Sequence, residues 1–264
     1  MNILITGVAS GIGFALSNKF LENNHNVYGI DINDIPLRDN FLGFKCDITN
    51  IESLNEVSKY LLDNNIKLDM IINVAGIHKM ASLVESSYND IKKVIEINLC
   101  GTMLVNNTFH KHLEEKGKIL MVTSEVASYD PLPFNGLYNV SKTALEAYAQ
   151  ALRQELNLLG QKVITIQPGA IETPLSNGSL TATLKLANET ILYKNQAHHF
   201  LYLVKNFMGT PIKTEKLAKF IYKVSLKKNP KYTYKIHRSI GLILLSILPK
   251  RIQCFVVKVL LNRR

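Results

Sequence analysis

The fold class that the sequence predicts is α/β, and three observations point to it. Short apolar runs alternate with amphipathic helical stretches along most of the chain. The apolar runs are nearly continuous rather than alternating, which is typical of parallel strands buried on both faces. A glycine-rich turn joins the first apolar run to the first helical stretch. Together these features predict a Rossmann-type doubly wound parallel sheet with a C-terminal helical extension.

The apolar runs define the expected strands, and stretches with a helical period of about 3.6 residues define the expected helices. The strands are expected within residues 2–6, 26–31, 41–49, 68–76, 116–124, 161–169 and 231–236. The helices are expected at residues 11–23, 51–64, 87–115, 137–159 and 213–228. In the first helix the apolar residues share one side, as in a helix that covers a sheet.

The pattern weakens between residues 170 and 211, where no clean strand is evident. We expect an irregular or helical insertion at about 174–210. It follows the last central strand, where α/β enzymes often place a lid over the substrate.

The composition is that of a globular protein. The chain has 264 residues, 47% of them hydrophobic, which suits one large α/β domain or two small ones. Cys46, Cys100 and Cys254 are widely spaced, so we expect neither a disulfide framework nor a metal site. The first strand pattern begins at residue 2, which leaves no room for a signal peptide. A reducing, cytoplasmic location is therefore expected.

The positive charge lies in the C-terminal quarter. Residues 205–264 contain 15 Lys and Arg and a single acid, Glu215, whereas residues 1–204 contain 16 Lys and Arg and 20 acids. Such asymmetry favours an anionic partner surface over a general role in solubility. We do not expect a nucleic-acid partner, because no recognition motif accompanies the charge.

We expect two parts in the chain, a domain at 1–237 and a basic, apolar, helical tail at 238–264. The apolar stretch 240–248 has nine residues, or about 13 Å of helix, too short for a hydrocarbon core of about 30 Å. A second apolar stripe follows Pro249, surrounded by cations such as Lys250 and Lys258. One hypothesis is that this tail lies on an anionic membrane surface. The alternative is that the stripe docks on the protein itself or on a partner subunit.

The glycine-rich turn at residues 6–13 reads TGVASGIG. Glycines between a strand and a helix let backbone N–H groups and the helix N-terminus approach a pyrophosphate. Asp31 ends the next strand, where a carboxylate can bind the adenosine ribose hydroxyls and repel a 2′-phosphate. No Arg or Lys lies in the turn or at 32–37. These features favour NAD over NADP.

Tyr138 and Lys142 are four residues apart at the start of the expected helix 137–159. This spacing places both on one face. A free phenol has a pKa of about 10, and a nearby cation lowers it. The pair therefore indicates acid–base chemistry, although a tyrosine beside a solvated lysine would give the same spacing.

The chain resembles the short-chain dehydrogenase/reductase (SDR) family over about residues 1–175. Four motifs carry the resemblance in order: TGVASGIG at 6–13, NVAG at 73–76, YNVSK at 138–142 and PGAIET at 168–173. Asn98 and Asp47 also stand where family members keep those residue types.

The resemblance implies roles for these residues. Tyr138 would be the general acid/base, Lys142 would lower its pKa and hold the nicotinamide ribose, and Ser124 would bind the substrate oxygen. Asn98 would hold a water that relays protons from Lys142. The implied dinucleotide contacts are Thr6, Gly7, Ser10, Gly11, Ile12, Gly13, Asp31, Asp47, Ile48, Asn73, Ala75, Gly76, Tyr138, Lys142, Pro168, Gly169, Ile171 and Thr173.

Two departures from the family pattern are visible. Val74 stands where the family usually has a second asparagine, which removes one polar contact. Ser124 lies fourteen residues before Tyr138, one more than usual, and the usual interval lands on Glu125. Ser124 aligns with the family serine if the segment 128–137 carries one extra residue.

The resulting hypothesis is an NAD(H)-dependent oxidoreductase that interconverts a secondary alcohol and a ketone. A lipophilic substrate such as a steroid, retinoid or lipid intermediate is suggested by the apolar insertion and tail. The alternatives are a 3-oxoacyl carrier-protein reductase, whose acidic partner would suit the basic tail, and a non-catalytic NAD-binding sensor or scaffold. The family also leads us to expect a homo-oligomer paired through helices 87–115 and 137–159.

Overall fold

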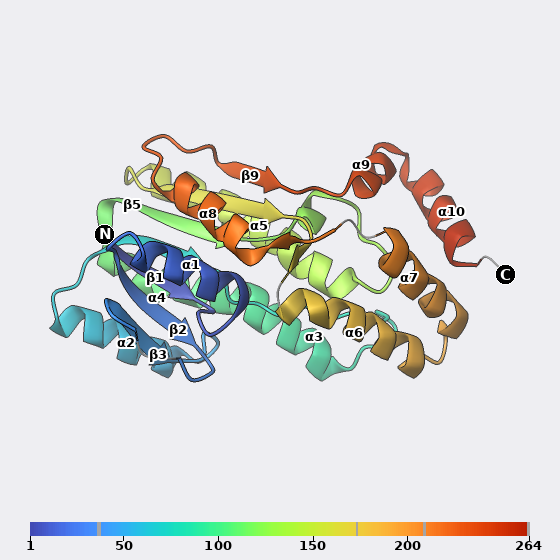
Figure 1. Cartoon of the computed structure of the whole chain (residues 1–264), viewed down its shortest axis with the longest axis horizontal. Helices are drawn as coiled ribbons and strands as arrows, with labels where there is room; N and C mark the ends of the chain where they lie inside the picture. Colours follow the sequence, from blue (N-terminus) through green and yellow to red (C-terminus); the bar gives the residue numbers. More distant parts are fainter. Residues whose placement is uncertain (36–37, 173, 208–209, 263–264) are drawn as a thin grey trace.

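The computed structural model describes residues 1–35, 38–172, 174–207 and 210–262. In these residues a seven-stranded parallel sheet has the order β3-β2-β1-β4-β5-β6-β9 (Figure 1). The strands are β1 (Asn2–Thr6), β2 (Asn26–Asp31), β3 (Phe41–Lys45), β4 (Leu68–Asn73), β5 (Leu113–Val122), β6 (Lys162–Pro168) and β9 (Thr233–Ile236). The strand order reverses between β1 and β4, which creates a crevice at the carboxyl ends of these strands.

Helices cover both faces of the sheet, as the fold class predicts. One face carries α1 (Gly11–Leu21) and α8 (Thr214–Ser225), and the other carries α2 (Ile51–Asp63), α4 (Thr102–Phe109) and α5 (Gly136–Asn157). Side chains alternate along a strand, so Ile3 and Ile5 pack with α1 and α8 whereas Leu4 packs on the opposite face. This confirms the doubly wound α/β architecture.

The prediction of a single helix at 87–115 is wrong in two respects: a π-helical segment interrupts the helix, and the helical region ends before Leu113. The structure has α3 (Tyr88–Ile95), a π-helical segment (Glu96–Gly101), α4, and a short 3₁₀ turn (His110–His112). Strand β5 then begins at Leu113, which pairs with Leu68 before a register shift. The polar residues that follow Leu113 hid this strand start, because they break the apolar pattern.

The insertion after β6 is helical rather than irregular. A two-residue strand β7 (Ile171–Glu172) pairs with β8 (Ile212–Lys213), and between them lie α6 (Pro174–Glu189) and α7 (Lys194–Phe207). The turn between these helices is fastened to the loop after β4. The carboxylate of Glu85 there accepts hydrogen bonds from Thr190 Oγ1 (2.6 Å) and from the N–H groups of Ile191 (2.8 Å) and Leu192 (3.0 Å).

The tail forms two helices, α9 (Ile240–Ile247) and α10 (Lys250–Leu261), and α10 packs against α7 at one end of the molecule (Figure 1). They meet at Pro249, the residue before α10, where a missing N–H costs no helical hydrogen bond. Over the described parts of the chain, no helix has both the length and the apolar character needed to cross a bilayer.

Candidate active site

The turn between β1 and α1 forms a backbone cradle. Gly7 has a φ of +77°, a conformation that glycine adopts without steric cost, and its N–H donates to Ile30 O (2.7 Å). A Cβ on Gly13 would lie 2.1 Å from Gly7 O, so α1 begins directly against the turn. Ser10 is exposed at the N-cap of α1 and makes no capping hydrogen bond. The turn therefore presents the N-terminus of α1, which fits a diphosphate.

Asp31 is fixed at the end of β2 and faces this turn. Its Oδ2 accepts the N–H of Ala9 (2.9 Å), and its Oδ1 accepts the N–H of Asn33 (2.9 Å). Lys45, beside Asp31 in the register of β2 and β3, forms an ion pair with Asp34 (2.8 Å). Lys45 lies outside the turn and residues 32–37, and only the pairing of β2 with β3 brings it beside Asp31.

The ends of β1 and β4 are linked through buried side chains. Thr6 Oγ1 accepts the N–H groups of Val74 and Ala75, both at 3.1 Å. Asn73 is buried and donates from Nδ2 to Asn106 (2.8 Å). Thr6 thus joins the carboxyl ends of β1 and β4, where the strand order reverses and where doubly wound sheets bind their ligands.

Other predicted cofactor residues flank the crevice. Asp47 Oδ1 accepts both the N–H and the hydroxyl of Thr49 (2.8 Å each), and Ile48 is buried against Gly101. Pro168 at the end of β6 and Ile171 in β7 are buried. Ile12 packs on the core below the turn, whereas Gly11 is partly exposed within it. Thr173 lies outside the described residues.

Gly169 lies directly against the connection from β9 to α9. A Cβ on it would fall 1.8 Å from His237 O and 3.0 Å from Glu125 Oε1. A side chain at this position would therefore collide with the start of the tail.

Asn98 lies in the π-helical segment and is fully buried. Its Oδ1 accepts the N–H of Ile77 (2.7 Å), and its Nδ2 donates to Ile77 O (2.9 Å) and to Ser141 Oγ (3.0 Å). A Cβ on Gly76 would lie 3.0 Å from Asn98 Oδ1 and 3.5 Å from Lys142 Nζ. Because Gly76 has no side chain, Asn98 of the π-helical segment and Lys142 of α5 can both approach the backbone that follows β4.

Tyr138, Ser124 and Lys142 come together at the start of α5. The Ser124 side chain lies close enough to the Tyr138 hydroxyl to lower its pKa. Lys142 Nζ donates to Val122 O (3.3 Å) and lies 5.7 Å from the centroid of the Tyr138 ring. The carboxylate of Glu125 instead accepts the N–H of Ser239 (2.7 Å). The serine side chain beside the tyrosine is therefore Ser124, as the alignment with one extra residue requires.

Burial controls the acidity of this group. It raises the pKa of Tyr138 to about 12, despite the opposing effect of the Ser124 side chain. It also lowers the pKa of Lys142 to about 8, opposed by the charge of Glu146. Burial of the hydroxyl is thus the largest influence on the pKa of Tyr138 in this arrangement. Tyr138 is a neutral phenol at pH 7.

His78 belongs to the site, although the sequence analysis missed it. Its ring meets the Tyr138 ring edge to face, with centroids 4.6 Å apart and planes at 89°. Its Nε2 forms a hydrogen bond with Asn135 Oδ1 (2.9 Å), and burial lowers its pKa, so it is neutral at pH 7. The available signal was its position, two residues after the NVAG motif.

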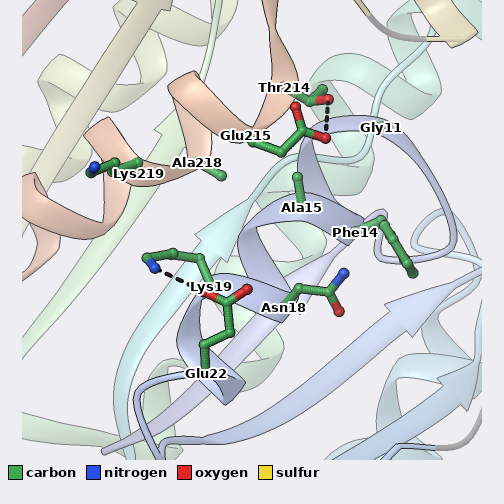
Figure 2. A pocket seen from close by; sticks show the side chains of 10 residues that line it. All are labelled: Gly11, Phe14, Ala15, Asn18, Lys19, Glu22, Thr214, Glu215, Ala218 and Lys219. Atoms are coloured by element: carbon green, nitrogen blue, oxygen red, sulfur yellow. Dashed lines mark hydrogen bonds and ion pairs between the residues drawn. The ribbon is translucent and has the colours of Figure 1, made fainter.

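A surface hollow of about 370 Å³ lies between α1 and α8 (Figure 2). Its lining includes Phe14 and Asn18 from α1 and Thr214 and Lys219 from α8, and it touches the cradle only at Gly11. None of the side chains grouped around Tyr138 lines it, so this hollow is separate from the candidate site.

A doubly wound sheet with a glycine-rich cradle and a buried tyrosine beside a lysine defines a nucleotide-binding oxidoreductase. The family model for short chain dehydrogenases matches residues 1–183, more than half of the chain. The protein is therefore a member of the short-chain dehydrogenase/reductase family.

Known proteins of this family resemble the chain at several levels. It is 34% identical over 199 residues to a NADPH-dependent 1-acyldihydroxyacetone phosphate reductase of Schizosaccharomyces pombe, a match over 72% of this chain and 67% of that protein. It is 25% identical over 236 residues to a 3-ketodihydrosphingosine reductase of Bacteroides thetaiotaomicron, covering 89% and 87%. The crystal structure of a short chain dehydrogenase family protein from Francisella tularensis superposes with a TM-score of 0.75 at 23% identity, covering 89% and 96%.

Proposed function

We propose that this protein is an NAD(H)-dependent enzyme that interconverts a ketone and a secondary alcohol. The observation that carries the proposal is the buried Tyr138 hydroxyl beside the Ser124 side chain, with Lys142 Nζ 5.7 Å from the centroid of the Tyr138 ring. A scaffold that only bound the dinucleotide would not need the Ser124 hydroxyl beside Tyr138, which argues against the sensor alternative.

The proposed chemistry assigns a task to each side chain. When bound, the nicotinamide ring supplies the hydride for the carbonyl carbon, or accepts it in the reverse direction. Tyr138 donates its proton to the carbonyl oxygen, and Ser124 donates a hydrogen bond to the same oxygen as charge develops. Lys142 holds the ribose, and with Asn98 it returns a proton to Tyr138. The raised pKa of Tyr138 keeps the phenol protonated, which is the form that donates a proton when a ketone is reduced.

Ser124 and Glu125 should differ sharply when each is replaced. Ser124→Ala removes a hydrogen-bond donor to the substrate oxygen and should lower the rate on the order of 10²-fold. Glu125→Gln keeps an oxygen that accepts the Ser239 N–H, so its rate should stay close to wild type. Steady-state rates of ketone reduction test this contrast. A larger loss in Glu125→Gln than in Ser124→Ala would assign the substrate oxygen to the other residue.

We propose NAD(H) as the preferred cofactor on the strength of Asp31, whose carboxylate is fixed against the glycine turn. Two features compete with this choice. The relative from Schizosaccharomyces pombe is NADPH-dependent, and Lys45 is a cation beside Asp31. The ion pair of Lys45 with Asp34 offsets that cation, whereas Asp31 would repel a 2′-phosphate.

Fluorescence titration of both cofactors measures this preference. NADH should bind at least about tenfold more tightly than NADPH, a difference of about 1.4 kcal/mol. Asp31→Asn should weaken the repulsion of the 2′-phosphate and so reduce the preference for NADH over NADPH. Lys45→Gln should increase that preference. Equal or tighter NADPH binding by the unaltered protein would overturn the assignment of Asp31.

We propose a lipophilic ketone as the substrate. An apolar cluster next to the site contains Met80 and Phe134 together with Leu186 of α6 and Phe200 of α7. The two relatives are named for ketones that carry an acyl or sphingoid chain. A 3-oxoacyl carrier-protein reductase remains the alternative, supported by the basic C-terminal quarter. A panel of long-chain ketones, steroids and 3-oxoacyl thioesters, followed at the NADH absorbance, separates these substrates, and no turnover of any would favour the sensor.

The remaining parts of the proposal concern organisation. We propose that residues 1–237 form the catalytic domain and residues 238–264 a basic tail. The protein would act in the cytoplasm as a homo-oligomer paired through the helical region 87–115 and α5.

A further inference from the structure

Six large apolar side chains point outward from the tail helices. They are 43% to 73% exposed, although side chains of this kind usually lie inside a protein. We refer to them as the C-terminal apolar face. Its members are Ile240, Leu244, Ile247, Ile252, Phe255 and Val259.

The orientation of α10 reverses the usual pattern of a surface helix. Its inner side buries Gln253 and Leu261, and Val257 packs there against the apolar cluster that contains Phe134 and Phe200. Phe255 and Val259 therefore fall on the side directed away from the protein, where a surface helix normally has polar residues. In α9 the exposed residues Ile240, Leu244 and Ile247 recur at helical spacing, and no side chain of that helix is buried.

The two helices are attached to the catalytic domain by specific contacts. The Ser239 N–H, at the start of α9, donates to Glu125, the residue after Ser124. Gln253 Nε2 donates to Asp130 Oδ2 (3.0 Å), and Lys250 forms an ion pair with the same carboxylate (3.5 Å). The two tail helices are thus attached to the domain, with α10 beside α7, and are not a detached segment (Figure 1).

The charged side chains that the tail itself contributes are all cationic. Arg251 and Lys258 are exposed, and each lies about one turn from Phe255 along α10. No acidic residue occurs after Glu215 in the sequence. Exposed apolar side chains flanked by cations match the boundary of an anionic bilayer, where apolar groups enter the acyl region and cations meet phosphates.

We propose that the C-terminal apolar face docks this protein on the surface of an anionic lipid bilayer. A second copy of the chain fits less well, since a symmetric contact would place Arg251 and Lys258 near the same cations of the partner. Docking would hold α7 and α10 at the membrane, so a lipophilic ketone could reach the insertion helices α6 and α7 from the bilayer. The docking itself does not depend on the proposed redox chemistry.

Vesicle flotation with the full-length protein tests the proposal. The vesicles contain phosphatidylcholine alone or phosphatidylcholine with phosphatidylserine. The unaltered protein should float with the anionic vesicles at low salt, and high salt should weaken the binding because the cations are screened. The double variant Leu244→Ser, Phe255→Ser should lose most of this binding, and Arg251→Gln, Lys258→Gln should lose its dependence on salt.

A matched control removes exposed apolar groups elsewhere. Leu158→Ser, Leu159→Ser changes two exposed leucines just beyond the far end of α5 and should float like the unaltered protein. Thermal unfolding checks that every variant is folded, and light scattering without vesicles gives its mass. Failure of the unaltered protein to float would overturn the proposal, as would equal binding by Leu244→Ser, Phe255→Ser. A loss of oligomer mass in that variant alone would assign the face to contact between subunits instead.

Discussion

Replacing Tyr138 by phenylalanine is expected to lower the turnover of any good ketone substrate by roughly 10²- to 10⁴-fold, the usual contribution of a general acid. The variant keeps the ring and its edge-to-face contact with His78, so the packing around α5 should persist. It removes only the hydroxyl that lies near Ser124. Binding of NADH should therefore stay within about threefold of wild type, as measured by fluorescence.

A second tyrosine on the same helix provides the control. The Tyr148 hydroxyl accepts a hydrogen bond from Asn106 (3.3 Å), and burial raises its pKa as well. Tyr148→Phe removes an equivalent group and should leave turnover nearly unchanged. If Tyr138→Phe were as active as Tyr148→Phe, another group would supply the proton and the proposed mechanism would fail.

The order of strands and helices could be predicted because buried parallel strands and amphipathic helices leave different periods in the sequence. Strand β2 was predicted with its observed bounds, and α5 within two residues at each end. The exception was the segment after α3. Its π-helical turn depends on Asn98 binding the backbone of Ile77 and on Gly101 meeting Ile48. Both contacts join residues far apart in the chain, so no local sequence pattern predicts them.

The candidate site divides in the same way. The i, i+4 spacing predicted Tyr138 and Lys142 on one helix face. The interval before Tyr138 left a choice between Ser124 and Glu125, and only the folded chain shows Ser124 near the Tyr138 hydroxyl and Glu125 bound to Ser239. The pKa of Tyr138 could not be predicted, since it depends on how deeply the folded chain buries the hydroxyl. His78 and Lys45 were missed because their importance comes from neighbours on other elements.

Replacing Gly13 by alanine is expected to disrupt both the cradle and the fold around it. The added Cβ would lie 2.1 Å from Gly7 O and 2.6 Å from Gly7 C, distances that no relaxed structure tolerates. Those atoms are backbone, so α1 must move away from the turn instead of a side chain rotating aside. We expect a loss of about 3 kcal/mol or more in the free energy of unfolding, at the upper end for overpacking.

The same displacement should weaken dinucleotide binding by more than about 100-fold, because the N-terminus of α1 would no longer be fixed against the turn. Thermal unfolding and NADH fluorescence measure the two effects. Gly241→Ala is the matched control, since a Cβ there has only Ser239 Oγ within reach, at 3.8 Å, and alanine favours helix α9 by about 0.5–1 kcal/mol. Normal NADH affinity and stability in Gly13→Ala would mean that the contact between α1 and the turn does not shape the binding site. A selective loss of NADH affinity in a folded Gly13→Ala protein would instead locate the diphosphate at this turn.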